Sequence, residues 1–345
     1  MRVLFLTLYP GQAASPRYRV HQFLPRLRAL GWRCDVACAV APEFWERYHA
    51  PDHRMRPRDY LFHERRTRRG QLANMDGYDA VFLQKALTTV YWRGMERKLE
   101  HVADRLLYDL DDAVHLAAPD QLARMFGWLE QPAQIRRIMA MAKATLAGNR
   151  WLQSEAQAAG GRATYFPTVV DTDSFTPAPQ PDCAYRLGWI GSPSTAKYLA
   201  PIAEPVCESG AECLVVGAGD APFEAEIAAW RLDEEAAQIA RMSVGLMPLP
   251  DTDWARGKCG LKALLYMACG RPVIASPVEG VESPVVHGET GFLADTPDEW
   301  REAIEALRDP ALRQRLGEAG RARVERHFSL DAWAPRMAEL IEAAA

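Results

Sequence analysis

The chain has 345 residues, of which 48% are hydrophobic, with a formal net charge of −4 and a sequence pI near 6.1. This length exceeds one typical domain, and the apolar content is enough for a two-domain soluble protein. The slightly acidic balance argues against a general nucleic-acid binder, and no apolar run reaches the roughly 18 residues that a membrane span needs.

The first half of the chain alternates apolar strands with helical patterns. Residues 3–8 form a continuous apolar run, typical of a parallel strand buried on both faces. A helix is predicted from about Pro16 to Gly31, because apolar residues recur there at helical spacing. Together they predict a parallel, doubly wound α/β sheet. Its further strands are expected at residues 34–40, 80–83, 106–110 and 144–147.

A proline-rich stretch from Pro177 to Pro181 precedes a fresh strand that begins at Tyr185. Such a stretch is typical of a boundary between domains. The sequence therefore predicts two domains, a linker and a C-terminal helix. Their expected ranges are 1–176 for the first domain, 177–184 for the linker, 185–328 for the second domain and 329–345 for the helix.

Seven cysteines are scattered along the chain without a paired Cys-x-x-Cys pattern. An odd number of such cysteines indicates reduced thiols, and it supports neither a zinc site nor a disulfide framework. The apolar start of the chain has no following cleavage signature, so it is interpreted as a strand rather than a signal peptide. We therefore expect a cytoplasmic protein.

Residues 257–276 combine a glycine-bearing loop, a short apolar helix and a buried strand. Gly260 lets the backbone approach a ligand, and the helix after it presents unpaired N–H groups and the positive end of its dipole. Lys258 and Lys262 add positive charge at the same place, which favours an anion site. The other interpretation is an ordinary helix-to-strand joint whose lysines only solvate the surface.

A second loop, Gly191-Ser-Pro-Ser-Thr195, lies between a strand and a predicted helix that contains Lys197. Its N–H groups and hydroxyls are suited to a phosphate, and the lysine would supply charge. The same residue types are also common at helix N-caps.

These segments resemble GT-B-fold glycosyltransferases, specifically the large retaining family 4. The Gly260-Leu261 pair opens a helix that ends Met-Ala-Cys-Gly before a strand reading Pro-Val-Ile-Ala, as in that family's nucleotide-sugar loop. The resemblance covers nearly the whole chain, is strong from Tyr165 onward and is weak before Tyr78. Other matching segments follow in the family's order: Pro167–Phe175, Leu187–Ser192, Leu214–Gly219, Val244–Leu249 and His287–Leu293.

The resemblance implies an α/β protein of two Rossmann-like, doubly wound domains that face a cleft and close around the substrates. It also implies that a last helix, with Ser329 as its N-cap, returns to pack on the first domain. Such enzymes move a sugar from a nucleoside diphosphate to an acceptor with retention of configuration, typically without a metal ion. We expect a UDP- or GDP-sugar donor, no further cofactor, and a glycan, lipid-linked glycan or small molecule as acceptor.

The same resemblance assigns residues to the donor. The family commonly holds the diphosphate with an arginine and a lysine five residues later, and Ser192 and Lys197 stand at those places. Lys197 is therefore also expected to act in catalysis, by stabilising charge on the leaving phosphate. Trp230 stands where the family often places backbone contacts to the base, and a core tryptophan is the other interpretation. The full predicted donor set is Gly191, Ser192, Lys197, Trp230, Lys258, Gly260, Leu261 and Lys262.

Two departures from the family lie in the donor loop. The family's two glutamates, which contact the donor sugar and ribose, correspond to Gly257 and Leu265 in this sequence. Their contacts cannot be carried over. Asp251 and Asp253 lie just before the loop and are considered as substitutes, although exposed loop carboxylates are usually only solvated.

Residues 108–115 place three acids and a histidine where an apolar strand ends, which is the edge at which open α/β sheets bind ligands. We expect Asp111, Asp112 or His115 to orient the acceptor hydroxyl or sugar. A metal site at Asp109 and Asp111 is the less favoured alternative. Asp109 as a helix cap and His115 as a structural histidine are the other interpretations.

Arg17, Tyr18 and Arg19 follow the first strand, where the family has a glycine-rich loop. Two arginines at that edge suggest an anionic group on the acceptor side. Eight arginines lie between Arg47 and Arg69. A plain solvated surface is preferred there over contact with an anionic membrane or a phosphorylated acceptor.

Two other functions stay open. A nucleotide-sugar 2-epimerase would share the fold, and the acidic residues would suit proton transfer. A non-catalytic nucleotide-sugar-binding partner would explain the missing glutamates. A nicotinamide dehydrogenase is disfavoured, because Gly217-Ala-Gly219 lacks a third glycine at the expected spacing.

Overall fold

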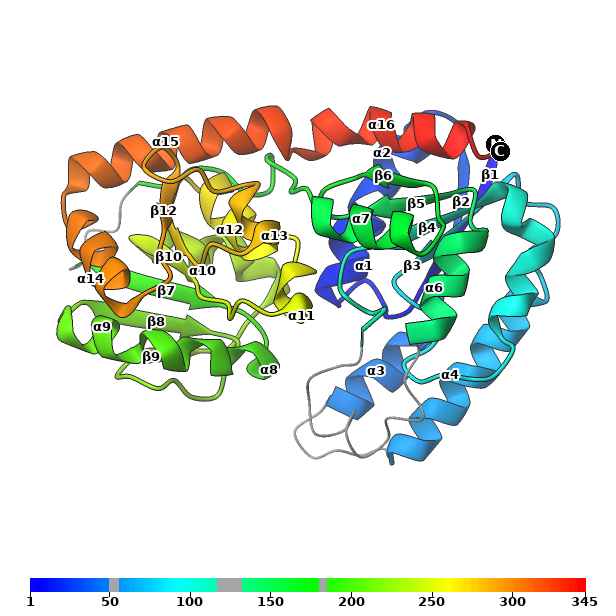
Figure 1. The fold of residues 1–345 in the computed structure, drawn as a ribbon, viewed down its shortest axis with the longest axis horizontal. Coiled ribbons are helices and arrows are strands. Elements are labelled where there is room, and N and C mark those ends of the chain that lie inside the picture. The colour runs from blue at the N-terminus through cyan, green and yellow to red at the C-terminus, as the bar shows by residue number, and fades with distance from the viewer. Residues whose placement is uncertain (50–55, 117–131, 180–184) are drawn as a thin grey trace. The chain divides into compact units, whose positions relative to one another are not determined.

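The computed structural model describes residues 1–49, 56–116, 132–179 and 185–345. These residues divide into two compact α/β units (Figure 1). Unit 1 comprises residues 1–168 and 333–345, and unit 2 comprises residues 169–332. Residues 180–184 of the predicted linker lie outside the described part of the chain.

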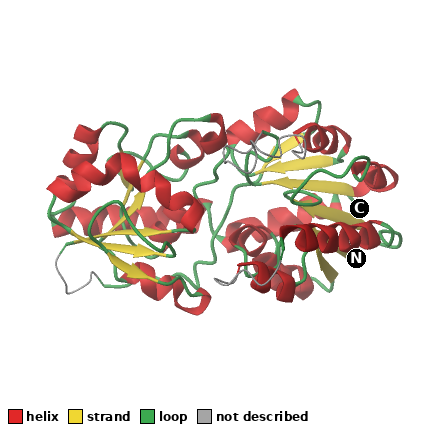
Figure 2. Cartoon of the chain, turned by 90° about the horizontal axis from the view of Figure 1, so that it is seen from below, coloured by secondary structure: helices red, strands yellow, loops and turns green. Residues whose placement is uncertain are grey.

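Unit 1 contains a six-stranded sheet with the order β2-β1-β3-β4-β5-β6, in which all pairs are parallel. Helices lie on both faces of this sheet (Figure 2). The strands are β1 (Arg2–Thr7), β2 (Arg33–Cys38), β3 (Ala80–Gln84), β4 (Leu106–Leu110), β5 (Ala144–Ala147) and β6 (Ala163–Tyr165). The helices are α1 (Ala14–Arg19), η1 (His21–Phe23), α2 (Leu24–Ala29), α3 (Pro42–His49), α4 (Pro57–Leu72), η2 (Glu96–Arg105), α6 (Pro132–Met141) and α7 (Arg150–Ala158).

The helix predicted after the first strand is broken into α1, η1 and α2. Val20 leaves helical geometry, with φ −130° and ψ −63°. Pro25 lies in the first turn of α2, where its missing N–H costs nothing, whereas within a continuous helix it would remove a hydrogen bond. The apolar spacing of this segment was predicted correctly, but its continuity was not.

Unit 2 contains a second parallel six-stranded sheet, with the order β12-β11-β10-β7-β8-β9. The strands are β7 (Arg186–Ile190), β8 (Glu212–Val216), β9 (Glu226–Ala228), β10 (Val244–Met247), β11 (Val273–Ala275) and β12 (Gly291–Leu293). The helices are α8 (Pro193–Ala196), η4 (Lys197–Ile202), α9 (Ala203–Glu208), η5 (Leu232–Glu234), α10 (Glu235–Ala240), α11 (Asp253–Arg256), α12 (Leu261–Ala268), α13 (Glu279–Glu282), α14 (Pro297–Ala306) and α15 (Pro310–His327).

Each sheet has a point where the order of its strands reverses. In unit 1 this point lies between β1 and β3, and in unit 2 between β7 and β10. Helices leave such neighbouring strands toward opposite faces, which opens a crevice at the carboxyl ends of the strands. Ligands of open α/β sheets bind in that crevice. Each unit therefore offers one such edge.

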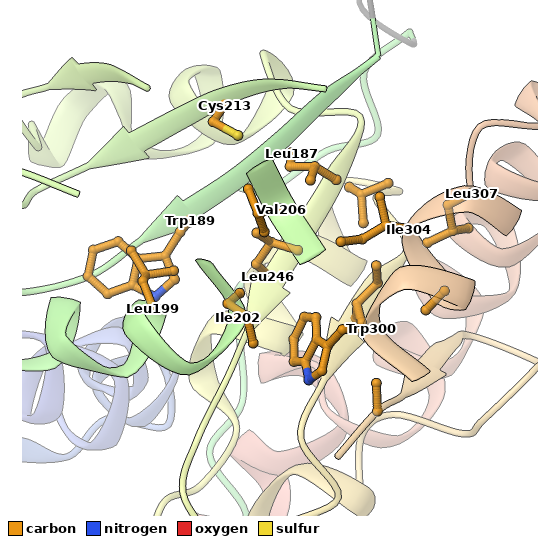
Figure 3. Packing of buried hydrophobic residues seen from close by; sticks show 14 of the residues in the cluster. Leu187, Trp189, Leu199, Ile202, Val206, Cys213, Leu246, Trp300, Ile304 and Leu307 are labelled. Atoms are coloured by element: carbon orange, nitrogen blue, oxygen red, sulfur yellow. The ribbon is translucent and has the colours of Figure 1, made fainter. Parts of the chain in front are cut away.

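The core of unit 2 holds Trp189, whose ring lies beside the carboxyl edge of the sheet, in a fixed position. Trp189 on β7 is 1% exposed and packs in one apolar cluster with Leu199, Ile202, Trp300 and others (Figure 3). This packing immobilises the indole ring beside the loop that follows β7. The ring then serves as a rigid wall of the site described below.

Helix α16 (Leu330–Glu342) begins in unit 2 and continues into unit 1. Ser329 caps it as predicted, because its Oγ accepts a hydrogen bond from the N–H of Ala332 at 3.2 Å. Trp333 then meets the rings of Tyr165 and Phe166 edge-on, at centroid distances of 5.9 and 5.4 Å. The C-terminal segment therefore completes the core of unit 1.

Deleting residues 329–345 should destabilise unit 1, although the deleted segment is distant in sequence. Trp333→Ala alone should cost about 2 kcal/mol, because it removes a large side chain packed on two rings. Hydrogen exchange followed by mass spectrometry should show faster exchange in peptides of β5 and β6, and unchanged exchange in β7. Glu339→Ala, at an exposed position of the same helix, is the control. Unaltered protection of β5 and β6 in both altered proteins would contradict this packing role.

Within the described residues, no helix is long and apolar enough to cross a membrane.

Candidate functional site

The ligand edge of unit 2 is built around two glycines. Gly217 has φ +86°, and a Cβ there would lie 2.3 Å from the carbonyl oxygen of Gly191. A Cβ on Gly191 would lie 2.6 Å from the Trp189 ring and 2.7 Å from Nζ of Lys262. The absence of both side chains therefore lets the loop after β7 close against β8 and leaves space for the Lys262 ammonium.

Lys262 lies in the first turn of α12, and its ammonium reaches back over the loop after β7. Its Nζ lies 4.4 Å from the ring centroid of Trp189 and donates a hydrogen bond to Thr195 Oγ1 at 3.3 Å. Burial of the ammonium, together with the nearby charge of Lys258, lowers the pKa of Lys262 to about 7. None of the ion pairs found among the described residues includes Lys262. A bound anion would supply the negative charge that would balance the Lys262 ammonium.

The start of α12 adds backbone donors to this cation. Gly260 adopts φ +67° at the N-cap, and a Cβ there would lie 2.8 Å from the carbonyl oxygen of Gly280. No side chain among the described residues caps the helix, so the N–H groups of its first turn, which begins at Leu261, lack a side-chain acceptor and are suited to an anion. Lys258, half-buried with its Nζ 5.4 Å from the Trp254 ring, stands in the same loop.

The predicted residues of the β7 loop are more exposed. The hydroxyl of Ser192 interacts with Ser194 Oγ at 2.9 Å and Thr195 Oγ1 at 3.4 Å, so it belongs to a local hydroxyl cluster. Lys197 is exposed, with its Nζ 5.5 Å from the ring of Tyr198. Of the three predicted lysines, Lys262 is thus the most desolvated and Lys197 the least.

Trp230 lies close to the Gly217 turn, because its Cβ would be 3.2 Å from a Cβ at Gly217. Its indole Nε1 donates to Glu235 Oε1 at 2.9 Å, which fixes the half-buried ring just after β9. Trp230 therefore lies at the carboxyl edge of the sheet, and its contact to a base stays a prediction.

The positions of the two missing glutamates carry no acid. Gly257 is buried and Leu265 is 2% exposed in the apolar interior of unit 2. The proposed substitutes Asp251 and Asp253 pair with Arg256 at 2.9 and 3.2 Å on the surface. They form a local ion-pair group before α12 rather than a part of the cation site.

The ligand edge of unit 1 holds a compact polar group. Gln84 at the end of β3 donates from Nε2 to Ser15 Oγ at 2.6 Å and to Asp111 Oδ1 at 3.3 Å. The hydroxyl of Ser15 in turn donates to Asp111 Oδ2. Asp111 was predicted, whereas Ser15 and Gln84 were not. The signal for Gln84 was a polar residue that directly ends an apolar strand.

Lys85 adjoins this group and has an unusual backbone. Its φ of +68° is the one positive φ outside glycine among the described residues. Its Nζ lies 3.2 Å from Asp112 Oδ2, and its backbone oxygen accepts a hydrogen bond from Tyr108 Oη at 2.6 Å. Burial lowers the pKa of Lys85, but Asp112 and Asp111 outweigh it and raise that pKa. Strained residues that the surroundings hold in place cluster at functional sites.

Two predicted residues of unit 1 are instead bound to each other in its interior. The buried Arg19 guanidinium donates to both carboxylate oxygens of Asp109 from Nε at 3.1 Å and from Nη2 at 2.5 Å. Burial raises the pKa of Asp109 to about 6, although Arg19 opposes this shift. The pair ties α1 to β4. Neither residue presents its charge to the ligand edge, and Asp109 is not a helix cap.

His115 is 1% exposed, and its Nε2 lies 3.1 Å from Glu155 on α7. Burial lowers the pKa of His115, partly offset by Glu155. These contacts favour the structural interpretation of this histidine. Tyr18 is buried, and Arg17 is half-buried with its guanidinium carbon 4.9 Å from the Tyr18 ring.

Over the described ranges, no group of three or more His, Cys, Asp or Glu side chains is arranged to hold a metal ion.

Comparison with known proteins places unit 2 in a family. A family model described as glycosyl transferases group 1 matches residues 186–309. The D-inositol 3-phosphate glycosyltransferase of Pseudarthrobacter chlorophenolicus is 44% identical over 69 residues, which is 19% of this chain and 16% of that protein. The N-acetyl-alpha-D-glucosaminyl L-malate synthase of Bacillus anthracis is 33% identical over 98 residues, or 28% of this chain and 25% of that protein. These matches thus span a quarter or less of each relative.

Solved structures extend the likeness to the whole fold. Sucrose-phosphate synthase from Thermosynechococcus elongatus aligns with a TM-score of 0.75 at 18% identity, over 99% of this chain and 98% of that one. Anabaena HepE in complex with UDP and glucose aligns with a TM-score of 0.72 at 15% identity, over 99% and 100%. Residues 186–309 therefore form a domain of the glycosyl transferases group 1 family, in a chain with the GT-B fold of two Rossmann-like domains.

Proposed function

We propose that this protein is a glycosyltransferase that moves a sugar from a nucleoside-diphosphate sugar to an acceptor, with retention of anomeric configuration. The observation that carries the proposal is the Lys262 ammonium, which lies over the Trp189 ring at the switch point of a group 1 domain. It has no carboxylate partner among the described residues, and burial lowers its pKa. A UDP- or GDP-sugar is the proposed donor. The HepE neighbour, which binds UDP, supports this choice of donor class.

We expect the ligand edge of unit 2 to stabilise the negative charge that develops on the leaving diphosphate. Breaking the bond to the anomeric carbon builds negative charge on the leaving phosphate oxygens. Lys262 and Lys258 would neutralise that charge, and the open N–H groups of α12 would add oriented dipoles. Thr195, which already hydrogen-bonds Lys262, would help to direct the ammonium. Lys197 would supply more remote, solvent-screened charge.

The polar group of unit 1 is suited to a sugar or other polyol acceptor. Ser15, Gln84 and Asp111 offer both donors and acceptors within one hydrogen-bonded group. Asp111 is the residue that can accept a hydrogen bond from an incoming hydroxyl and orient it. The ion pair between Lys85 and Asp112 would help to hold the neighbouring Asp111 carboxylate in place. The acceptor itself is proposed only as a glycan, a lipid-linked glycan or a small molecule.

A non-catalytic nucleotide-sugar binder is the second candidate, because Gly257 and Leu265 leave the site without the family's two glutamates. The comparisons do not favour the 2-epimerase alternative. Incubation with a panel of UDP- and GDP-sugars should release nucleoside diphosphate only when an acceptor is supplied, with a glycosylated product in mass spectrometry. Binding without turnover for every donor and acceptor pair would select the non-catalytic alternative. The anomeric proton coupling of the product would test retention.

We also propose that transfer needs no metal ion, because Lys262 and Lys258 would supply the positive charge that a metal ion would otherwise provide. Turnover should survive EDTA. Loss of activity with EDTA and recovery with added manganese would overturn this proposal. That result would instead favour a metal site at Asp109 and Asp111.

A further inference from the structure

Helix α4 presents a basic and aromatic surface to solvent. Arg58, Phe62, Arg65, Arg66 and Arg69 recur at spacings of three and four residues, so they lie along one face of the helix. Phe62 is 59% exposed and is one of four large hydrophobic side chains that are exposed among the described residues. An isolated exposed phenylalanine needs no explanation, but one framed by four arginines on a single helix face is distinctive.

The opposite face of α4 fixes this orientation. Arg68 is fully buried, and its Nη2 donates to the carbonyl oxygen of Thr7 at 2.5 Å. Glu64 is also fully buried and accepts from the N–H and Oγ1 of Thr89 at 2.9 and 2.7 Å. Rotating the helix to bury Phe62 would break these bonds and leave buried charges unpaired. The exposure of Phe62 is therefore imposed by the fold.

A second aromatic ring extends the surface beyond the helix. Trp92, in the loop after β3, lies 6.1 Å from the ring centroid of Phe62. The guanidinium carbon of Arg65 lies 4.3 Å from the centroid of the Trp92 ring, and the next residue, Arg93, is exposed. Tryptophan and phenylalanine rings favour the boundary between lipid headgroups and acyl chains, and arginine side chains reach the headgroups beside them. This surface combines both kinds of side chain.

The geometry points to a membrane-docking surface, made of Arg58, Phe62, Arg65, Arg66, Arg69, Trp92 and Arg93, that binds bilayers containing anionic phospholipid. The arginines complement the negative headgroups although the whole chain has a net charge of −4. Asp59, in the first turn of α4, lies 3.6 Å from Nε of Arg58 and offsets part of that residue's charge. A soluble polyanion would use the arginines but not Phe62, which is why a bilayer is the favoured partner. This inference is independent of the proposed glycosyl transfer.

The test is co-sedimentation of the full chain with phosphatidylcholine vesicles that contain or lack phosphatidylglycerol. The protein should bind only the anionic vesicles, and added salt should release it. Arg66→Gln with Arg69→Gln should weaken binding about 25-fold, at about fivefold for each charge removed. Phe62→Ser should weaken it about tenfold, because the phenyl ring no longer enters the interface.

Two control variants match these changes elsewhere. Arg315→Gln with Arg326→Gln removes the same charge from exposed positions of α15, and Leu30→Ser removes another exposed apolar side chain. Both should bind anionic vesicles like the unaltered protein. Failure of the unaltered protein to bind, or an equal loss in the α15 variant, would overturn the inference. If Phe62→Ser bound normally while soluble heparin displaced the vesicles, the surface would be a polyanion site instead.

Discussion

Lys262→Met should lower the affinity for UDP or GDP by about 10- to 100-fold, the effect of losing one charge-assisted contact to phosphate. Methionine is unbranched and only one heavy atom shorter than lysine, and its thioether can still pack on the Trp189 ring. Isothermal titration calorimetry measures the change directly. Lys98→Met, at an exposed position of η2 in unit 1, is the matched control and should bind normally. Equal affinity of Lys262→Met and the unaltered protein would refute the assignment.

Lys262→Met should also remove the pH dependence of diphosphate affinity that we expect in the unaltered protein. The free protein holds Lys262 with a pKa of about 7, below its ordinary 10.5. Binding of a diphosphate must therefore bring a proton to Lys262 at higher pH, so affinity should fall as pH rises above about 7 in the unaltered protein. Lys262→Met should show a flat profile there, and proton uptake on binding should disappear.

Stability should show the opposite trend with pH. Because the folded pKa of Lys262 is lowered, the unfolded chain holds the extra proton between pH 7 and 10.5. The unaltered protein should therefore lose stability, relative to Lys262→Met, as pH falls through that window, and the difference should vanish above it. Urea denaturation at several pH values measures this.

Lys258→Ala and Lys197→Ala should weaken diphosphate binding by successively smaller factors, with little effect on the melting temperature. Lys258 is half-buried beside Lys262, whereas the exposed Lys197 is screened by water. Unchanged affinity in calorimetry for both variants would remove them from the site and leave Lys262 alone.

Asp111→Asn should lower turnover by at least about 100-fold while the affinity for the donor stays unchanged. The carboxylate accepts from both Ser15 and Gln84, and an amide has only one oxygen with which to do so. The hydrogen bonds among Ser15, Gln84 and residue 111 would rearrange. The negative charge that orients the acceptor hydroxyl would also be lost. Asp104→Asn, on the exposed surface of η2, is the matched control. Full turnover in Asp111→Asn, or an equal loss of donor affinity, would contradict an acceptor-side role.

Local sequence was enough to predict most of the secondary structure. The strands at residues 106–110 and 144–147 begin and end as predicted, because short apolar runs between polar segments leave few alternatives in a parallel sheet. β6 was missed. It is an edge strand of three residues, none of them fully buried, so it carries no apolar run to detect. Its strand character comes from pairing with β5.

The sequence by itself also determined the two-domain α/β class, and it predicted an anion site at the loop before α12, since glycine, helix start and lysines are contiguous there. Only the tertiary structure decided which charges are available to a ligand. Arg19 and Asp109 lie 90 residues apart and neutralise each other once buried, whereas Ser15 meets Asp111 across 96 residues because parallel strands end at one edge. Lys262 became the most perturbed lysine because packing on Trp189 removes its water, and no local pattern records that loss.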